Sequence, residues 1–164
     1  MDKIDWSLQI NGVHRASFDD MVKVMPDLAC IKESFPEDVN DFTWDVKVHM
    51  LMPNQFPCIP NWHFDNIPRV NNKQDFDKVD SSLPMYLWIS GGPLTEFRNG
   101  GLIAPRTWKR FTQKDEHRGT MARDFTWRGF VRATHNKILA ANPSGESVVR
   151  RHSQVYLDSN NFSW

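Results

Sequence analysis

The stretch that decides the fold runs Asp45-Val46-Lys47-Val48-His49-Met50-Leu51-Met52. Its apolar and polar side chains alternate. One parity holds Val46, Val48, Met50 and Met52, and the other holds Asp45, Lys47 and His49, with Leu51 as the exception. Side chains of a strand point alternately to its two faces, so this pattern predicts a β-strand with one buried face.

Further strands are expected on the C-terminal side. Residues 85–89 form a continuous apolar run that ends at Gly91-Gly92-Pro93, as a buried strand would. Residues 127–134 alternate between two faces: Trp127, Gly129, Val131 and Ala133 on one, Arg128, Phe130 and Arg132 on the other. Weaker strands are predicted over 107–111, 147–149 and 154–157. The closely spaced prolines indicate an ordered loop or edge segment over 53–61.

The N-terminal part of the chain is predicted to be helical. Ser17 precedes Phe18-Asp19-Asp20, a helix start with acidic residues in its first turn. Pro26 interrupts that helix and can open a second one over 27–34, before a break at Phe35. We therefore expect one mostly-β domain over residues 1–164, a sandwich or barrel, with a helical flank at 1–40 and its core at 41–164.

Composition narrows the class of protein. The 164 residues carry 20 basic and 20 acidic side chains, which excludes a strongly basic nucleic-acid binder as a description of the whole chain. Residues 1–100 hold 9 basic and 15 acidic groups, whereas 101–164 hold 11 and 5. Either these charges pair within one sheet, or the C-terminal third forms a basic face for an anionic ligand or nucleic acid. No apolar run is long enough to span a bilayer and no secretory signal is visible, so a cytoplasmic, membrane-free setting is expected.

The densest chemical signal is Pro60-Asn61-Trp62-His63-Phe64-Asp65. On an extended segment His63 and Asp65 point to the same side, and Phe64 points away. With one more histidine they would form a 2-His-1-carboxylate triad, which holds a metal on one face and leaves the opposite face open. A lone H-x-D is weak evidence, because it also occurs in surface turns.

Three downstream histidines could complete the triad: His117, His135 and His152. His117 lies just before the strand that carries Arg128 and Arg132. A buried arginine beside a metal pocket needs an anionic partner, and a dicarboxylate co-substrate would provide one through paired hydrogen bonds to the guanidinium. The alternative for Arg128 is an arginine whose stem covers apolar surface.

This order of motifs resembles the Fe(II)/2-oxoglutarate-dependent oxygenases over roughly residues 44–135, and the segment 57–65 resembles small bacterial or phage proteins of this type. The resemblance implies a double-stranded β-helix (jelly-roll) core. It implies that His63, Asp65 and His117 are the catalytic iron ligands. The two histidines are 54 residues apart. It also implies Arg128, 11 residues after His117, as the anchor for the far carboxylate of 2-oxoglutarate, with Arg132 as the second candidate. Such a dioxygenase would hydroxylate a substrate that the sequence does not identify.

The remaining residues of interest have plainer expectations. A buried Tyr86 hydroxyl needs a partner, for which a 2-oxoglutarate carboxylate is one candidate. Trp62, Phe64 and Trp88 either line a pocket or pack in the core. His49 is expected near the site or at the surface, and His14 and His152 at the surface. Cys58 has no helix N-terminus to lower its thiol pKa, which argues against a nucleophilic cysteine.

Two other functions stay open at this stage. A cupin-like or non-catalytic jelly-roll protein would bind metal, or none, without consuming 2-oxoglutarate. An interaction protein with a basic C-terminal face would bind a partner or nucleic acid in a salt-sensitive way, independently of His63. The substrate can be a small molecule or a macromolecule; nucleic acid is not favoured.

Overall fold

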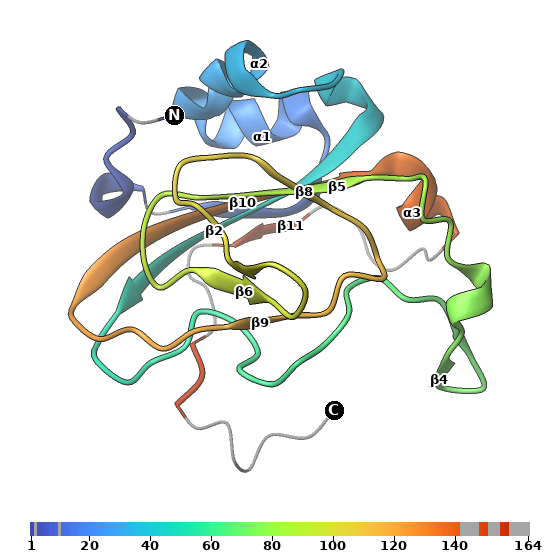
Figure 1. The fold of residues 1–164 in the computed structure, drawn as a ribbon. Coiled ribbons are helices and arrows are strands. Elements are labelled where there is room, and N and C mark those ends of the chain that lie inside the picture. Colours follow the sequence, from blue (N-terminus) through green and yellow to red (C-terminus); the bar gives the residue numbers. More distant parts are fainter. Residues whose placement is uncertain (2, 10, 142–147, 151–154, 158–164) are drawn as a thin grey trace.

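The computed structural model describes residues 1, 3–9, 11–141, 148–150 and 155–157, which form antiparallel sheets and a few short helices (Figure 1). The prediction of a mostly-β chain is confirmed at this level. The strands are β1 Gly12–Ala16, β2 Phe42–Leu51, β3 Arg69–Val70, β4 Lys73–Gln74, β5 Met85–Ile89, β6 Thr95–Phe97, β7 Gly101–Leu102, β8 Lys109–Phe111, β9 His117–Gly119, β10 Thr126–His135 and β11 Val148–Arg150. The helices and 3-10 turns are η1 Trp6–Leu8, α1 Phe18–Val24, η2 Pro26–Cys30, α2 Ile31–Ser34, η3 Val39–Asp41, η4 Phe76–Lys78 and α3 Asn136–Ala140.

The larger sheet has six strands in the order β11-β1-β2-β10-β5-β8. Its centre is the long antiparallel pair β2–β10, whose register runs from Leu51 opposite Thr126 to Phe42 opposite His135. This register places apolar side chains opposite each other on one face, because the two alternating patterns run in phase. The predicted parities of both strands are therefore confirmed.

One face of the large sheet packs against the N-terminal helices, which lie above it in Figure 1. Ser17 caps α1 by accepting the backbone N–H of Asp20 at 3.1 Å, as its sequence predicts. The ring of Phe18 then packs edge-on against Trp44 of β2. The predicted second helix takes the form of η2 followed by α2, and it ends before Phe35.

The flank is not purely helical. Residues 12–16 form β1, which joins the large sheet between β11 and β2, so the sheet begins well before residue 41. The segment is too short and too polar for its strand character to stand out in the sequence, and pairing with β2 supplies its hydrogen bonds.

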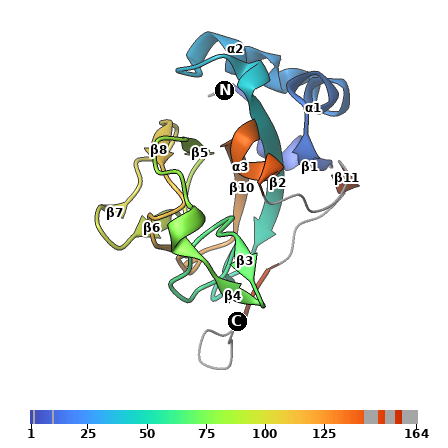
Figure 2. The same ribbon diagram turned by 90° about the vertical axis from the view of Figure 1, so that its right-hand side faces the viewer.

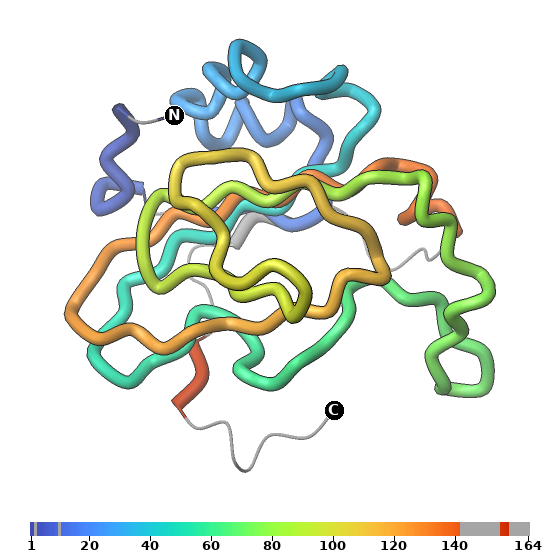
Figure 3. Tube along the Cα trace, viewed as in Figure 1, coloured from blue at the N-terminus to red at the C-terminus, as the bar shows by residue number. Residues whose placement is uncertain are grey.

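The opposite face of the large sheet is covered by a second layer, the three-stranded sheet β7-β6-β9. This layer lies in front of the β2–β10 pair in the tube view (Figure 3) and to one side of it after a quarter turn (Figure 2). A second apolar cluster fills the space between the layers, with Leu87 and Ile89 of β5, Phe97 of β6, Phe111 of β8 and Phe130 of β10 among its members.

This second layer shows that the prediction of only one buried face for β2 is wrong. The parity that holds Asp45, Lys47 and His49 does not face solvent; Asp45 is 3% exposed and His49 is 2% exposed. The polar face of β2 turns inward because the small sheet lies over it. Met50 on the other parity, at the end of β2, is 49% exposed.

The predicted C-terminal strands fall only partly within the described residues. β11 pairs with β1, and Tyr156 forms an isolated bridge with Phe56. Ser147, His152 and Gln154 lie outside the described residues. None of the helices in the described part of the chain has the length and hydropathy to span a bilayer.

Candidate metal centre

The candidate centre is built by pairing a loop with a strand that lies far away in the sequence. His63 lies in the loop that follows β2, and His117 begins β9. The two residues exchange both backbone hydrogen bonds, each with an N···O distance of 3.0 Å. Directly opposed residues of an antiparallel pair project their side chains to the same face. The backbone therefore places both imidazoles on one side.

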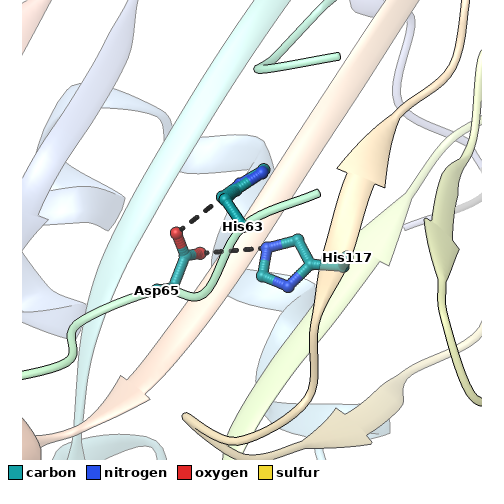
Figure 4. A group of neighbouring side chains, drawn as sticks. All are labelled: His63, Asp65 and His117. Atoms are coloured by element: carbon teal, nitrogen blue, oxygen red, sulfur yellow. Dashed lines mark ion pairs between the residues drawn. The ribbon is translucent and has the colours of Figure 1, made fainter. Parts of the chain in front are cut away.

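Asp65 joins them because it follows His63 by two positions. The oxygens of Asp65 lie 3.9 Å from Nε2 of His63 and 3.4 Å from Nε2 of His117 (Figure 4). One ligand atom from each residue lies within 4.8 Å of the others. Phe64 packs edge-on against Phe76, and this separate aromatic contact is consistent with the predicted outward direction.

Both imidazoles are oriented by backbone carbonyls. Nδ1 of His63 lies 2.8 Å from the carbonyl oxygen of Asn61, and Nδ1 of His117 lies 2.9 Å from that of Asp115. Each Nδ1–H donates to its carbonyl, so Nε2 of each ring faces the space between the three side chains and carries a lone pair there when the ring is neutral. That is the arrangement a divalent transition metal requires of two neutral histidines.

The electrostatics favour a neutral His63 and an ionised Asp65, whereas a bound metal would have to displace a proton from His117. Burial lowers the pKa of His63, which favours its neutral, ligating form. Burial opposes ionisation of Asp65, but Arg132 and His117 outweigh it and hold the pKa of this carboxyl well below its usual range. Burial is the largest single effect on His117 and lowers its pKa, but the hydrogen bond to Asp65 and the negative charge of that carboxylate together outweigh burial, so the pKa is raised.

The three side chains line a cavity of about 130 Å³ between the sheets. Leu87, Phe111 and Phe130 contribute apolar walls, while Lys47, Thr95 and Arg132 contribute polar groups. A water molecule needs about 10–15 Å³ of such volume, so the cavity can hold a small organic ligand.

Arg132 joins the partly buried Asp65 to a second carboxylate, the buried Asp45. Its Nη1 donates to Asp65 at 2.6 Å, and its Nη2 donates to Asp45 at 2.8 Å. This guanidinium has carboxylate partners on two sides, so a co-substrate would have to compete for it. Arg132 was the second candidate for a carboxylate anchor, and the structure instead pairs it within the protein.

His14 was expected at the surface, and the structure places it on the cavity wall. Its Nδ1 lies 2.7 Å from Asp45. The register shifts by one residue between Val13 and Ala16, which makes β1 bulge opposite Asp45, and Arg15 adopts a φ of 53° there. Bulges re-aim side chains, and nothing in the sequence of this short segment signals one.

Arg128 is completely buried on the cavity-facing side of β10, although it does not line the cavity. Its Nε donates to the carbonyl of Pro93 at 2.8 Å, and Nη1 lies 3.5 Å from Nδ1 of His49. Nη2 has no hydrogen-bond partner among the described residues. The hydroxyl of Thr95 lacks one as well, and Thr95 does line the cavity.

Tyr86 lies on the opposite face of the large sheet, away from the cavity. Its ring packs within the aromatic cluster under the helical flank, and its hydroxyl donates to Glu37. The buried phenol has a partner, as expected, but that partner belongs to the protein. The prediction that a co-substrate carboxylate binds this hydroxyl therefore has no geometric support.

Other singled-out residues have structural roles. Trp88 packs against Trp6 in the core, and the ring of Trp62 makes cation–π contacts with the guanidiniums of Arg98 and Arg118. His135 accepts the backbone N–H of Lys137 at the start of α3, and the third candidate ligand, His152, lies outside the described residues. Burial raises the pKa of the Cys58 thiol, so this cysteine is a poor nucleophile at neutral pH.

The charge asymmetry is explained in part by pairing between the two segments. Arg132 binds Asp45 and Asp65, and Arg118 binds Glu96. Acidic groups of the first hundred residues thus pair with basic groups of the last third, as the simpler of the two interpretations predicts.

Comparison of the chain with protein-family models, with curated proteins and with solved structures finds no match. The function is therefore argued from the site itself.

Proposed function

We propose that the protein is an Fe(II)- and 2-oxoglutarate-dependent dioxygenase that hydroxylates a substrate. One observation carries the proposal: two histidines and one carboxylate converge on a cavity, and a buried, incompletely bonded arginine lies behind its wall. Metal ligands and a buried donor for a dicarboxylate are the two elements this reaction requires.

The donor set fits the metal. Two imidazole nitrogens and one carboxylate oxygen are the ligands of the facial triad of non-haem Fe(II) oxygenases. His63, Asp65 and His117 would hold the ion from one side, and the cavity on the other side leaves coordination positions for a chelating co-substrate and O₂. Other divalent metals of the first transition row suit the same ligands, so experiments can use them as substitutes.

The co-substrate also has a fitting environment. A buried guanidinium with an unused donor is costly unless an anion completes its hydrogen bonds. Nη2 of Arg128 and the hydroxyl of Thr95 are two such donors, and Thr95 lies two residues after the Pro93 carbonyl that Arg128 binds. We infer that the far carboxylate of 2-oxoglutarate binds both groups. Thr95 lines the cavity, whereas Arg128 lies just behind the wall, so the carboxylate would have to extend between the lining side chains to contact it.

The topology supports a double-stranded β-helix. The chain leaves β2 of the large sheet, pairs with β9 of the small sheet at His63, and returns to the large sheet as β5. It then crosses to the small sheet as β6 and β7, returns as β8, crosses again as β9, and returns to the large sheet as β10. This repeated crossing between two facing antiparallel sheets is the course that a jelly-roll takes.

The residues of the chain have distinct tasks in this reaction. Bound Fe(II) would supply the coupling of O₂ reduction to oxidative decarboxylation of 2-oxoglutarate. His63, Asp65 and His117 hold and orient the reacting centre, with their Nδ1–carbonyl and Arg132 contacts fixing the ligand directions. Arg128 and Thr95 orient the co-substrate. Leu87, Phe111 and Phe130 exclude water from the reacting atoms.

An anaerobic titration tests the proposal. Metal-free protein receives Fe(II) and then 2-oxoglutarate, while the visible metal-to-ligand charge-transfer band of the chelate is followed. We expect the band in the native protein and its loss in His63→Ala. His135→Asn is the matched control, because it changes a histidine outside the cluster and retains a capping side chain.

The other outcomes favour the other functions. Iron binding without the band would favour a cupin-like metal protein or a non-catalytic jelly-roll. Absence of iron binding would contradict the proposal and direct attention to partner binding by the basic C-terminal third.

A further inference from the structure

Lys47 is a cavity residue whose charge the proposed metal and co-substrate do not use. It lies on β2, its side chain lines the cavity, and its ammonium group lies 5.5 Å from the centre of the Phe130 ring. Among the described residues, no carboxylate lies within ion-pair distance of it. The side chain is half-buried, so the ammonium has lost part of its water without gaining an anionic partner.

The two carboxylates of this region, Asp45 and Asp65, already have partners. Asp45 binds His14 and Arg132, and Asp65 binds Arg132 and would ligate the metal. Burial has the largest effect and lowers the pKa of Lys47, and the like charge of Arg132 lowers it further, whereas the charges of Asp45 and Asp65 act in the opposite direction without restoring it. Since the ammonium form is disfavoured overall, an anion placed beside it would be favoured on electrostatic grounds.

The charges of the loaded site do not balance. With a divalent ion bound and its two histidine ligands neutral, the positive charges are the ion, Lys47, Arg128 and Arg132; the negative charges are Asp45 and Asp65. Dianionic 2-oxoglutarate still leaves one positive charge in excess. An uncompensated charge in a partly buried site is unfavourable, so a further anion complements the site.

The register fixes where this charge lies. Along the β2–β10 pair, Lys47 is opposite Phe130, between the Asp45–Arg132 pair toward the metal and the His49–Arg128 pair at the proposed co-substrate end. His14 of the neighbouring strand β1 contacts Asp45 through Nδ1 and also lines the cavity. Lys47 thus lies on the cavity wall between the proposed metal end and the proposed co-substrate end.

We propose that Lys47 binds an anionic group, a carboxylate or a phosphate, of the substrate that is hydroxylated. This inference rests on the proposed function and deepens it, because it assigns the substrate to the small organic anions or to molecules that present one such group to the cavity. Arg128 serves the co-substrate, and Lys47 serves the substrate.

The test uses full-length protein loaded with Mn(II) and 2-oxoglutarate, with inorganic phosphate and ¹³C-labelled acetate as probes. Paramagnetic relaxation of the ³¹P or ¹³C signal reports an anion near the metal. We expect relaxation of at least one probe in the native protein and an affinity at least tenfold weaker in Lys47→Met. Lys47→Arg should restore binding to within about threefold, and Lys73→Met, an exposed lysine on β4, should change nothing. The probe that binds more tightly identifies the group as carboxylate or phosphate.

Three results would overturn the inference. The first is that neither probe signal shows paramagnetic relaxation with the native protein. The second is that Lys47→Met relaxes the probe signals as strongly as the native protein does. The third is that Lys47→Met no longer binds 2-oxoglutarate, which would make Lys47 the co-substrate anchor. Mn(II) and 2-oxoglutarate binding are measured before any probe is added. A failure there contradicts the proposed function, whereas a failure confined to the probes contradicts only the role of Lys47.

Discussion

At the residue scale, the site depends on one buried ion-pair network. Asp45 accepts hydrogen bonds from Arg132 and the Arg15 backbone and contacts His14, and Arg132 in turn holds Asp65. Removing one member of a buried pair leaves the other charge uncompensated, at a cost of about 3–5 kcal/mol. The network therefore stabilises the fold and orients a proposed metal ligand.

Asp45→Asn tests this network through pH. Burial raises the pKa of Asp45, but Arg132 and His14 outweigh burial and lower it overall, so its stabilisation is present above the unfolded pKa of about 3.9 and is lost on acidification. We expect the variant to be about 3 kcal/mol less stable at pH 7. The difference in unfolding free energy between the native protein and the variant should decrease by about 1 kcal/mol between pH 7 and pH 3. Urea unfolding across this range measures it, and a constant difference would contradict the assignment.

Arg128→Met tests the co-substrate anchor. Methionine fills a similar volume without charge, so folding and metal binding should be retained. The affinity for 2-oxoglutarate should fall at least tenfold, measured by titrating the Fe(II) protein anaerobically. Arg69→Met, an exposed arginine on β3, is the matched control. Equal affinities in Arg128→Met and the native protein would exclude this anchor.

At the scale of elements, the centre depends on how closely the loop before His63 packs on β9. The backbone N–H of Gly119 donates to the carbonyl of Ile59 at 2.9 Å. A Cβ at Gly119 would lie 2.7 Å from Sγ of Cys58 and 2.8 Å from its carbonyl oxygen. Only glycine permits this approach, and the loop that it admits carries both His63 and Asp65.

Gly119→Ala should therefore weaken metal binding without removing any ligand. The added methyl group displaces the loop, and misplaced ligands typically lower metal affinity about tenfold or more. Competition with a chelator gives the affinity. Gly91→Ala has no atom within 4 Å of the added Cβ and serves as the control, with native affinity expected. Native affinity in both variants would show that the close approach is not required.

At the scale of the whole molecule, the metal would join parts of the chain that are otherwise held by a few hydrogen bonds. His63 and Asp65 belong to a long irregular segment between β2 and β5, and His117 belongs to the small sheet. A ligand that binds only the folded state stabilises it by mass action.

Thermal unfolding with and without metal measures this coupling. At a metal concentration one hundred times the Kd, the folded state gains about 2.7 kcal/mol. For a chain of this size the Tm should rise by about 5–10 °C. His117→Ala should show no metal-dependent rise, even if its own Tm is lower. A rise of similar size in this variant would place the metal elsewhere.

The sequence by itself determined the β-rich class, the central strand pair and the candidate ligands. These follow from local patterns: alternation in residues 45–52 and 127–134, and the two-residue spacing of His63 and Asp65. His117 could be favoured over its rivals by its position before the arginine-bearing strand.

Only the tertiary structure decided the surroundings of that site. The inward direction of Asp45 and His49 depends on the sheet that covers them, and the position of His14 depends on a bulge in a short strand. The partners of Arg132 and Tyr86 are far away along the chain. Periodicity shows which side chains share a face, but what lies opposite that face is set by long-range packing, and local sequence carries no record of it.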